Sequence, residues 1–224
     1  MRIRVGSILL LAVFFALTTS VAAFASAPCG IANEIYCQGW DGSGNLYASQ
    51  NDTTSGGFGN YATVYDHFTF SQAWNVQSFH FVGGYFNIAP PPFVSAVTLT
   101  FYTDNAGIPG NAIATGSFGS FNETLIGGQI YSYDLYFSSF YMGPGTYWAS
   151  VVPDLDFPPQ WGWATSSTGD GAGYQCYFGS CATVGGVNFA FAIDGTSPVP
   201  EPGTMVMLGT GILGLAGTLR RKLL

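Results

Sequence analysis

The stretch SAVTLTFYTD at residues 95–104 decides the fold class of this chain, because its side chains alternate between apolar and polar. Val97, Leu99 and Phe101 fall on one face, and the intervening threonines fall on the other. A period of two residues is the signature of a β-strand with one buried face. The stretch therefore predicts a half-buried strand.

The same period returns elsewhere in the chain. In residues 61–70 the apolar side chains share one face, although Asp66 interrupts it. Residues 129–137, 146–152 and 188–194 alternate in the same way. We therefore predict a series of short strands rather than helices.

Composition and turn signals agree with this prediction. The segments DNAGIPG at 104–110 and GPGT at 143–146 have the Gly and Pro content of tight turns. Aromatic residues make up 17% of the chain and charged residues only 8%, which suits strands joined by turns. We predict an all-β passenger of about seven to ten strands over residues 61–196, an antiparallel β-sandwich of jelly-roll type. The polar, Gly-rich residues 26–60 are predicted to form a disulfide-containing, irregular lead-in.

Positive charge is confined to the two ends of the chain. No Lys or Arg lies between Val5 and Leu219, whereas all twelve carboxylates lie there, so the body has a formal charge of −12. Phosphates and anionic sugars are recognised through Lys and Arg. The composition therefore argues against nucleic acid and against anionic substrates as partners.

Residues 1–25 are predicted to form a secretory signal peptide. Arg2 and Arg4 precede an apolar stretch, expected to be helical, and small residues surround Ala23 and Ala25. This order is typical of a cleaved signal, and we expect cleavage after Ala25.

Residues 197–224 combine a Val-Pro-Glu-Pro tetrad, an apolar span and a basic tail. As a helix, the span at 203–219 would rise about 25 Å, slightly less than a hydrocarbon core of about 30 Å. Its four glycines suit a temporary transmembrane helix better than a packed soluble one. The cations Arg220, Arg221 and Lys222 would hold its end on the cytoplasmic side.

This ending resembles the PEP-CTERM sorting signal of exported proteins of Gram-negative bacteria. The resemblance rests on the apolar span and on Pro200, Glu201, Pro202, Arg220 and Arg221. It implies that an exosortase, a membrane enzyme similar to cysteine proteases, recognises the signal and removes the tail. It also implies a transient stay in the inner membrane and delivery to the cell surface or extracellular matrix, often beside exopolysaccharide synthesis.

A second resemblance concerns the passenger. The stretches at 73–86, 99–110, 145–151, 160–166 and 189–195 are together similar to a β-sandwich passenger of many exported bacterial proteins. That group has no established activity. The resemblance therefore implies a fold and a location rather than a function.

The four cysteines, Cys29, Cys37, Cys176 and Cys181, predict two disulfides in an exported protein. Four cysteines allow three connectivities, and pairing of sequence neighbours, which closes two small loops, is the simplest. A zinc site is the alternative, but these spacings match no familiar set of zinc ligands.

Glycan contact is a binding function that the composition leaves open. Trp161 and Trp163 flank Gly162, so their rings would point to the same side of an extended segment, with Gln160 nearby. Exposed aromatic rings stack on sugar faces and amides bond to hydroxyls, so these residues are candidate contacts. The alternative is that one or both tryptophans belong to the core.

Calcium is the metal for which the sequence offers candidate ligands. Asp104, Asn105 and Asp170 lie in predicted loops and carry the oxygen atoms that calcium prefers. The alternative is that these side chains serve only as turn formers. No other cofactor is expected.

We expect no enzyme activity. The two histidines, His67 and His80, each lie inside a strand-like pattern, without a Gly-x-Ser-x-Gly elbow. The expected function is that of a non-enzymatic surface or matrix protein that contacts exopolysaccharide. One alternative is a secreted hydrolase that acts on carbohydrate through the loop carboxylates Asp154, Asp156 and Asp170. Another is a purely structural surface protein without a ligand.

Overall fold

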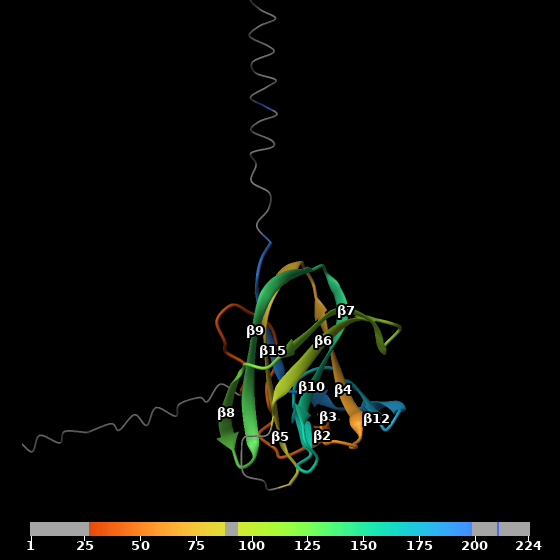
Figure 1. Cartoon of the computed structure of the whole chain (residues 1–224). Helices are drawn as coiled ribbons and strands as arrows, with labels where there is room; N and C mark the ends of the chain where they lie inside the picture. The colour runs from red at the N-terminus through yellow and green to blue at the C-terminus, as the bar shows by residue number, and fades with distance from the viewer. Residues whose placement is uncertain (1–26, 88–93, 199–209, 211–224) are drawn as a thin grey trace, which may run out of the picture.

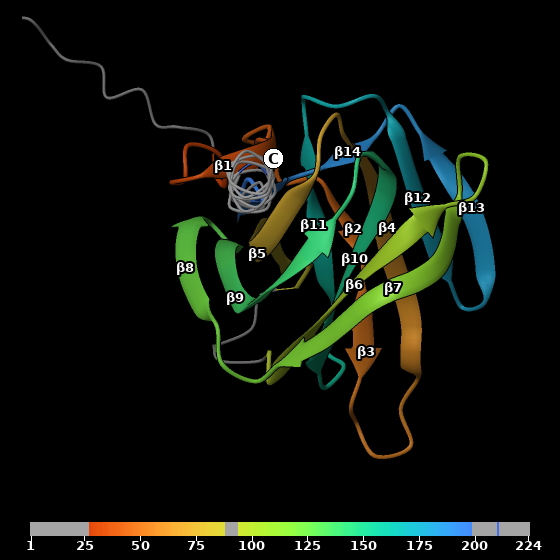
Figure 2. The ribbon, with the colours of Figure 1, turned by 90° about the horizontal axis from the view of Figure 1, so that it is seen from above.

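The computed structural model describes residues 27–87, 94–198 and 210, and the described part of the chain is built from fifteen strands in two sheets (Figures 1 and 2). The eight-stranded sheet contains β1 (Glu34–Gln38), β2 (Leu46–Ala48), β5 (Trp74–Tyr85), β8 (Asn122–Gly127), β9 (Ile130–Met142), β11 (Trp161–Ser166), β14 (Asn188–Phe189) and β15 (Phe191–Thr196). The seven-stranded sheet contains β3 (Gln50–Asp52), β4 (Gly59–Phe70), β6 (Ala96–Asp104), β7 (Pro109–Phe118), β10 (Gly145–Leu155), β12 (Ala172–Tyr177) and β13 (Ser180–Gly185). The all-β prediction is confirmed for these residues.

Eight of the strands form the frame of the two sheets. One sheet has the neighbours β1, β15, β5 and β9, and the other has the neighbours β4, β10, β6 and β7. Every adjacent pair among them is antiparallel. Along the chain, β6 and β7 are joined as a hairpin, and each other step between successive frame strands crosses from one sheet to the other.

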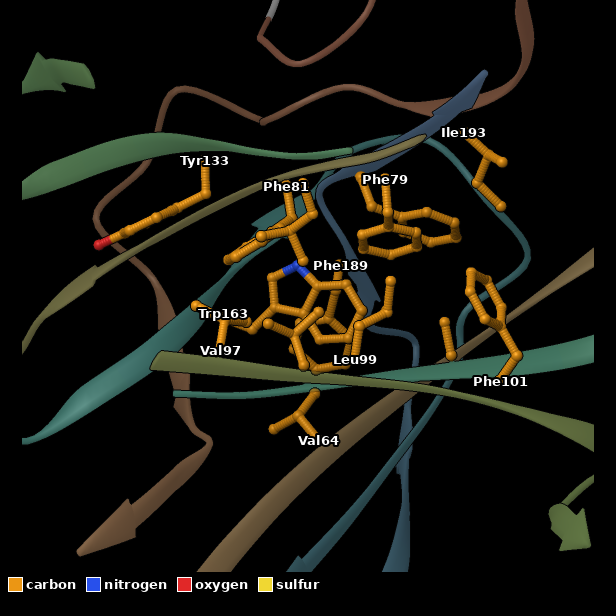
Figure 3. Packing of buried hydrophobic residues seen from close by; sticks show 14 of the residues in the cluster. Val64, Phe79, Phe81, Val97, Leu99, Phe101, Tyr133, Trp163, Phe189 and Ile193 are labelled. Carbon is orange, nitrogen blue, oxygen red and sulfur yellow. The ribbon is translucent and has the colours of Figure 1, made fainter. Parts of the chain in front are cut away.

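The core lies between the two sheets, which pack as a β-sandwich (Figure 3). Val97, Leu99 and Phe101 are all buried, as the alternation in residues 95–104 predicts. From the opposite sheet, Phe79 approaches Phe101 with a ring-centroid distance of 5.8 Å. Each fully buried side chain of this size stabilises the fold by about 1.5–3 kcal/mol, before the entropy of ordering the chain is counted.

Asp66 faces this core, which explains why it interrupts the apolar face of β4. Its carboxylate accepts hydrogen bonds from the backbone N–H of Phe189, at 2.6 Å, and of His67, at 2.8 Å. Burial raises the pKa of Asp66 well above its usual value, although these two bonds oppose the shift. Because Phe189 belongs to the opposite sheet, the carboxyl group links the two layers.

The predicted irregular lead-in is instead part of the sandwich. Within residues 27–60, β1 pairs with β15, β2 pairs with β11, and β3 pairs with β4 and β10. Two of these strands have only three residues each, which is too short for a two-residue period to be recognised. Backbone pairing with longer strands, rather than their own side-chain pattern, gives them their conformation.

Both disulfides pair sequence neighbours, so the simplest connectivity is confirmed. Cys29 is bonded to Cys37, with the Cα atoms 5.7 Å apart. Cys176 and Cys181 are bonded directly across the β12–β13 hairpin, with the Cα atoms 4.0 Å apart.

Three predicted elements lie outside the described residues. These are the signal peptide at 1–25, all of the apolar span at 203–219 except Thr210, and the sorting residues Pro200, Glu201, Pro202, Arg220 and Arg221. Within the residues that the structure describes, no helix has the length and apolar character needed to cross a membrane.

Candidate functional site

The glycan platform predicted at Trp161 and Trp163 is wrong, because both side chains are completely buried. The Trp161 indole N–H donates to the Tyr133 hydroxyl at 3.1 Å, and the Trp163 indole N–H donates to the Ala190 carbonyl at 3.0 Å. The two rings do share one side of β11, as expected, but that side faces the core between the sheets. The alternative interpretation, in which both tryptophans are core residues, is confirmed.

A different candidate site lies on the outer face of the seven-stranded sheet. A cleft of about 230 Å³ crosses β4, β10 and β6 on the side away from the core. Its walls combine tyrosine rings, hydroxyl groups, amides and one carboxylate. The lining residues are Asn51, Asn60, Thr63, Tyr65, Thr98, Thr100, Tyr102, Ser150, Val152 and Asp154.

Two tyrosines place aromatic rings in this cleft. Tyr65 alternates with the core residue Val64, and Tyr102 follows the core residue Phe101, so strand alternation turns both tyrosines outward. Their ring centroids are 5.4 Å apart and the ring planes are inclined at 64°. Burial, with a smaller contribution from Tyr102, raises the pKa of Tyr65 to about 12, so its hydroxyl stays neutral at physiological pH.

The polar groups of the cleft are held in place by bonds to one another. The Asn51 amide donates to the Asp154 carboxylate at 2.9 Å, and the Thr63 hydroxyl donates to Asn60 at 3.1 Å. The Tyr102 hydroxyl lies 3.1 Å from the hydroxyl of Ser150. The cleft thus presents oriented hydroxyl, amide and carboxylate groups beside aromatic rings, which is the chemistry that suits an uncharged, hydroxyl-rich ligand.

The candidate calcium ligands have partners of their own. Asp104 accepts hydrogen bonds from the Trp148 indole at 2.8 Å and from the backbone N–H of Gly107 at 3.2 Å. Asp170 contacts the His67 ring at 2.7 Å and accepts from the backbone N–H of Ala172 at 3.1 Å. These contacts favour the turn-forming interpretation of both carboxylates.

Asn105 also lies in a turn, where its backbone N–H donates to the carbonyl of Ile108 at 2.9 Å. In residues 27–87, 94–198 and 210, one cluster contains three or more metal-ligating side chains. It consists of Glu34 with Cys29 and Cys37. Because those cysteines are joined in a disulfide, their sulfur atoms are not available as thiolate ligands.

The second histidine, His80, links a serine to an aspartate through hydrogen bonds, as the histidine of a catalytic triad does. The His80 ring is 2.6 Å from the Ser78 hydroxyl and 2.7 Å from the Asp134 carboxylate. Ser78, however, is only 1% exposed, so its hydroxyl is closed to a substrate from solution. These hydrogen bonds therefore satisfy the buried polar groups on the outer side of β5.

The carboxylates of the hydrolase alternative have separate partners, and Asp154 lies in strand β10 rather than in a loop as predicted. Asp154 accepts from Asn51 within the cleft, whereas Asp156 accepts from the Thr53 hydroxyl at 2.7 Å. Asp170 is paired with His67. The structure thus gives each of the three acids its own hydrogen-bonded setting.

A cluster of aromatic side chains lies where three loops meet at one end of the sandwich. We call this cluster the aromatic end, and it consists of Phe58, Tyr61, Phe157, Tyr177 and Phe178. Phe58, Phe178 and Tyr177 are 57%, 54% and 43% exposed. The Gln160 side chain joins the cluster by donating to the Tyr61 hydroxyl at 3.1 Å, so this predicted contact residue is part of the aromatic end.

Asp52 holds two of the loops that carry these rings. Its carboxylate accepts hydrogen bonds from the backbone N–H groups of Thr54 at 3.0 Å, Phe58 at 2.7 Å and Phe157 at 3.1 Å. Burial alone would raise the pKa of Asp52, but bonds from Thr54, Phe58 and Phe157 outweigh it and lower the pKa to about 2. The ionised carboxylate therefore joins the β3–β4 loop to the β10–β11 loop.

Replacing Asp52 by alanine should destabilise the protein by about 1–3 kcal/mol, because three partly buried backbone N–H groups lose a charged acceptor. Since the folded-state pKa lies below the unfolded value, the Asp52 contribution is complete above about pH 4 and is lost as pH falls towards 2. Urea unfolding at several pH values measures this difference. A gap between wild type and Asp52→Ala that stayed constant from pH 7 to 2 would contradict the ionised-brace interpretation.

Comparison with known families identifies the end of the chain. Residues 198–222 match the model of the PEP-CTERM protein-sorting motif. The chain therefore carries the sorting motif that its last residues resemble, and the motif marks an exported protein that passes through the membrane and is sorted by an exosortase. No curated protein matches the chain at a significant level.

Proposed function

We propose that this PEP-CTERM protein is a non-enzymatic component of the cell surface or extracellular matrix of a Gram-negative bacterium and contacts exopolysaccharide there. Its signal peptide starts export, and its apolar span holds it in the inner membrane until the tail is removed. The passenger acts without a cofactor, and the candidate calcium ligands serve as turn formers. The observation that carries the proposal is the cleft that contains Tyr65 and Tyr102.

The fold supports this proposal. The frame strands follow the connectivity of a jelly roll, in which the chain passes repeatedly between two antiparallel sheets. Such a sheet presents a broad, rigid outer face. Fold alone does not assign a function, so the argument rests on the side chains of the cleft.

The cleft chemistry favours a neutral polysaccharide. A sugar ring offers C–H groups to an aromatic face and hydroxyl groups to amides, hydroxyls and carboxylates. Tyr65 and Tyr102 supply the rings, and Asn51 with Asp154 supplies an amide and a carboxylate. No Lys or Arg of the body is available to attract an anionic polymer.

Replacing Tyr65 by alanine should weaken retention on a matrix of the producing cells' exopolysaccharide about ten-fold or more. The substitution removes one aromatic face of the cleft, and ten-fold corresponds to about 1.4 kcal/mol. Affinity electrophoresis of the full chain, with thermal unfolding in parallel, measures binding and folding separately.

The matched control is Tyr141→Ala, because Tyr141 is 63% exposed on β9 and belongs to the other sheet. Its removal should leave retention unchanged. Equal retention of wild type, Tyr65→Ala and Tyr141→Ala would reject the cleft as the site. Release of reducing sugar during the assay would instead support the hydrolase alternative.

A further inference from the structure

The turn at the tip of the aromatic end holds Phe178 in a backbone conformation that other residue types adopt more readily. Phe178 and Gly179 join β12 to β13 and have φ values of +46° and +79°. Two positive φ angles are typical of a type I′ turn, in which asparagine usually precedes glycine. A left-handed backbone conformation is unfavourable for a bulky residue, so the chain holds this ring outward against its backbone preference.

Three contacts fix the position of this turn and of the ring beside it. The Cys176–Cys181 disulfide joins the two strands next to the turn. The backbone N–H of Phe178 donates to the Tyr61 carbonyl at 2.6 Å. The Asp52 carboxylate holds the N–H of Phe58, whose ring lies 5.3 Å from that of Phe178. The exposed rings are therefore pre-positioned, which lowers the entropy cost of binding.

The aromatic end lies far from residue 198, the last residue of the described range 94–198. Phe58 directly precedes β4, a strand of twelve residues that spans roughly 36–40 Å. β5 begins at Trp74, only four residues after β4 ends, and Thr196 at the end of β15 pairs with Asn75. The aromatic end and residue 198 thus lie at opposite ends of the sandwich (Figure 1).

The aromatic end and the cleft are connected through two short segments of the polypeptide. Asn60 lines the cleft two residues after Phe58, and Asp154 lines it three residues before Phe157. Two loops therefore lead directly from the polar cleft to the exposed rings. A chain lying in the cleft would reach the aromatic end without crossing another element.

Charge decides between the possible occupants of this surface. The body carries twelve carboxylates and no Lys or Arg, so an anionic lipid surface, an anionic polymer and a second copy of the chain would all be repelled at low salt. A neutral polysaccharide meets no such penalty. Its rings can also pack on phenylalanine and tyrosine faces.

We infer that the aromatic end is a second contact surface for the same neutral polysaccharide chain, which binds along its length from the cleft to Phe58, Tyr177 and Phe178. This inference rests on the proposed function. It adds that the protein contacts several consecutive sugar units within a polysaccharide, rather than the end of the polymer or a single sugar.

The test compares the full-length chain and its variants in native gels that contain neutral glucan, mannan, galactan or xylan, with alginate as the anionic polymer and chitosan as the cationic one. Phe178→Asn suits the turn, so relief of strain offsets lost packing and the Tm should stay within about 3 °C of wild type. Phe178→Asn and Phe58→Ala should each weaken retention by a neutral polymer about ten-fold. Tyr141→Ala should leave it unchanged.

The polymer length gives a second measurement. Oligosaccharides long enough to reach from the cleft to the aromatic end should bind wild type more tightly than short ones. Phe178→Asn should remove that gain in affinity. If Tyr65→Ala loses binding but Phe178→Asn and Phe58→Ala keep it, the second surface is refuted and the proposed function stands. If no neutral polymer retards wild type, or chitosan alone does so, the second surface and the proposed function are both refuted. A dimer that Phe178→Asn abolishes would identify the surface as a contact between copies and overturn the inference.

Discussion

Replacing Trp163 by alanine should destabilise the protein by about 3–5 kcal/mol, a large part of the free energy of unfolding of a typical domain. The side chain is completely buried, and its ring lies 5.4 Å from Phe189 and 5.8 Å from Phe191. Removing it leaves a large cavity between the two sheets, because neighbouring side chains relax only partly into such a space. We expect a lower Tm and a lower urea midpoint than for wild type, as measured by circular dichroism and urea titration.

The matched control for this prediction is Trp163→Phe, which keeps most of the ring volume. It loses the hydrogen bond to the Ala190 carbonyl, but that carbonyl still accepts from the N–H of Val82 at 3.1 Å. We therefore expect a cost of about 1–2 kcal/mol and a folded protein. A folded Trp163→Ala variant that had lost glycan retention alone would contradict the core position and restore the platform hypothesis.

The fold could be predicted from sequence where a strand is long and has one face in the core. Residues 95–104 and 129–137 satisfy both conditions, and their apolar positions lie in the core as expected. The tryptophans of β11 differ because that strand is covered on both sides. A side chain at Gly162, on the face opposite the tryptophans, would collide with Phe86 and Leu46. Alternation identifies two faces but does not tell which of them is open to solvent.

The short strands of the lead-in could not be predicted, because each of them pairs with at least one strand about a hundred residues or more away. Gln50, in β3, is completely buried among polar partners and accepts from the backbone N–H of Trp161 at 2.9 Å. A polar side chain in a Gly-rich segment indicates a loop when only local sequence is considered. Its burial follows from a partner that the local pattern does not contain.

The cleft was missed for a related reason, although a signal was present. Tyr65 and Tyr102 lie 37 residues apart and come together only because β10 pairs with both β4 and β6. Each is an aromatic residue at a position where alternation predicts a polar outer face. A large ring on the predicted solvent side of a strand is thus the feature that sequence reasoning could have used to find this site.

Replacing Pro200, Glu201 and Pro202 together by alanine should nearly abolish release of the processed protein. Proline lacks a backbone N–H and disfavours helix in the residue before it, so we expect the two prolines to oppose helix formation around the glutamate. Three alanines would allow a helix that begins in the span to continue through this segment. An exosortase would then meet a helix at its recognition motif, and we expect the precursor to stay in the membrane fraction with its tail.

Intact mass spectrometry and cell fractionation distinguish the precursor from the processed form. The control is Thr196→Ala with Ser197→Ala, because both positions precede the matched motif at 198–222 and should leave processing unchanged. The passenger should remain folded in both variants, since its described sandwich ends before the altered tripeptide. Normal removal of the tail from the triple-alanine variant would show that the apolar span and the basic residues suffice for sorting, and that the Pro-Glu-Pro conformation has no part in recognition.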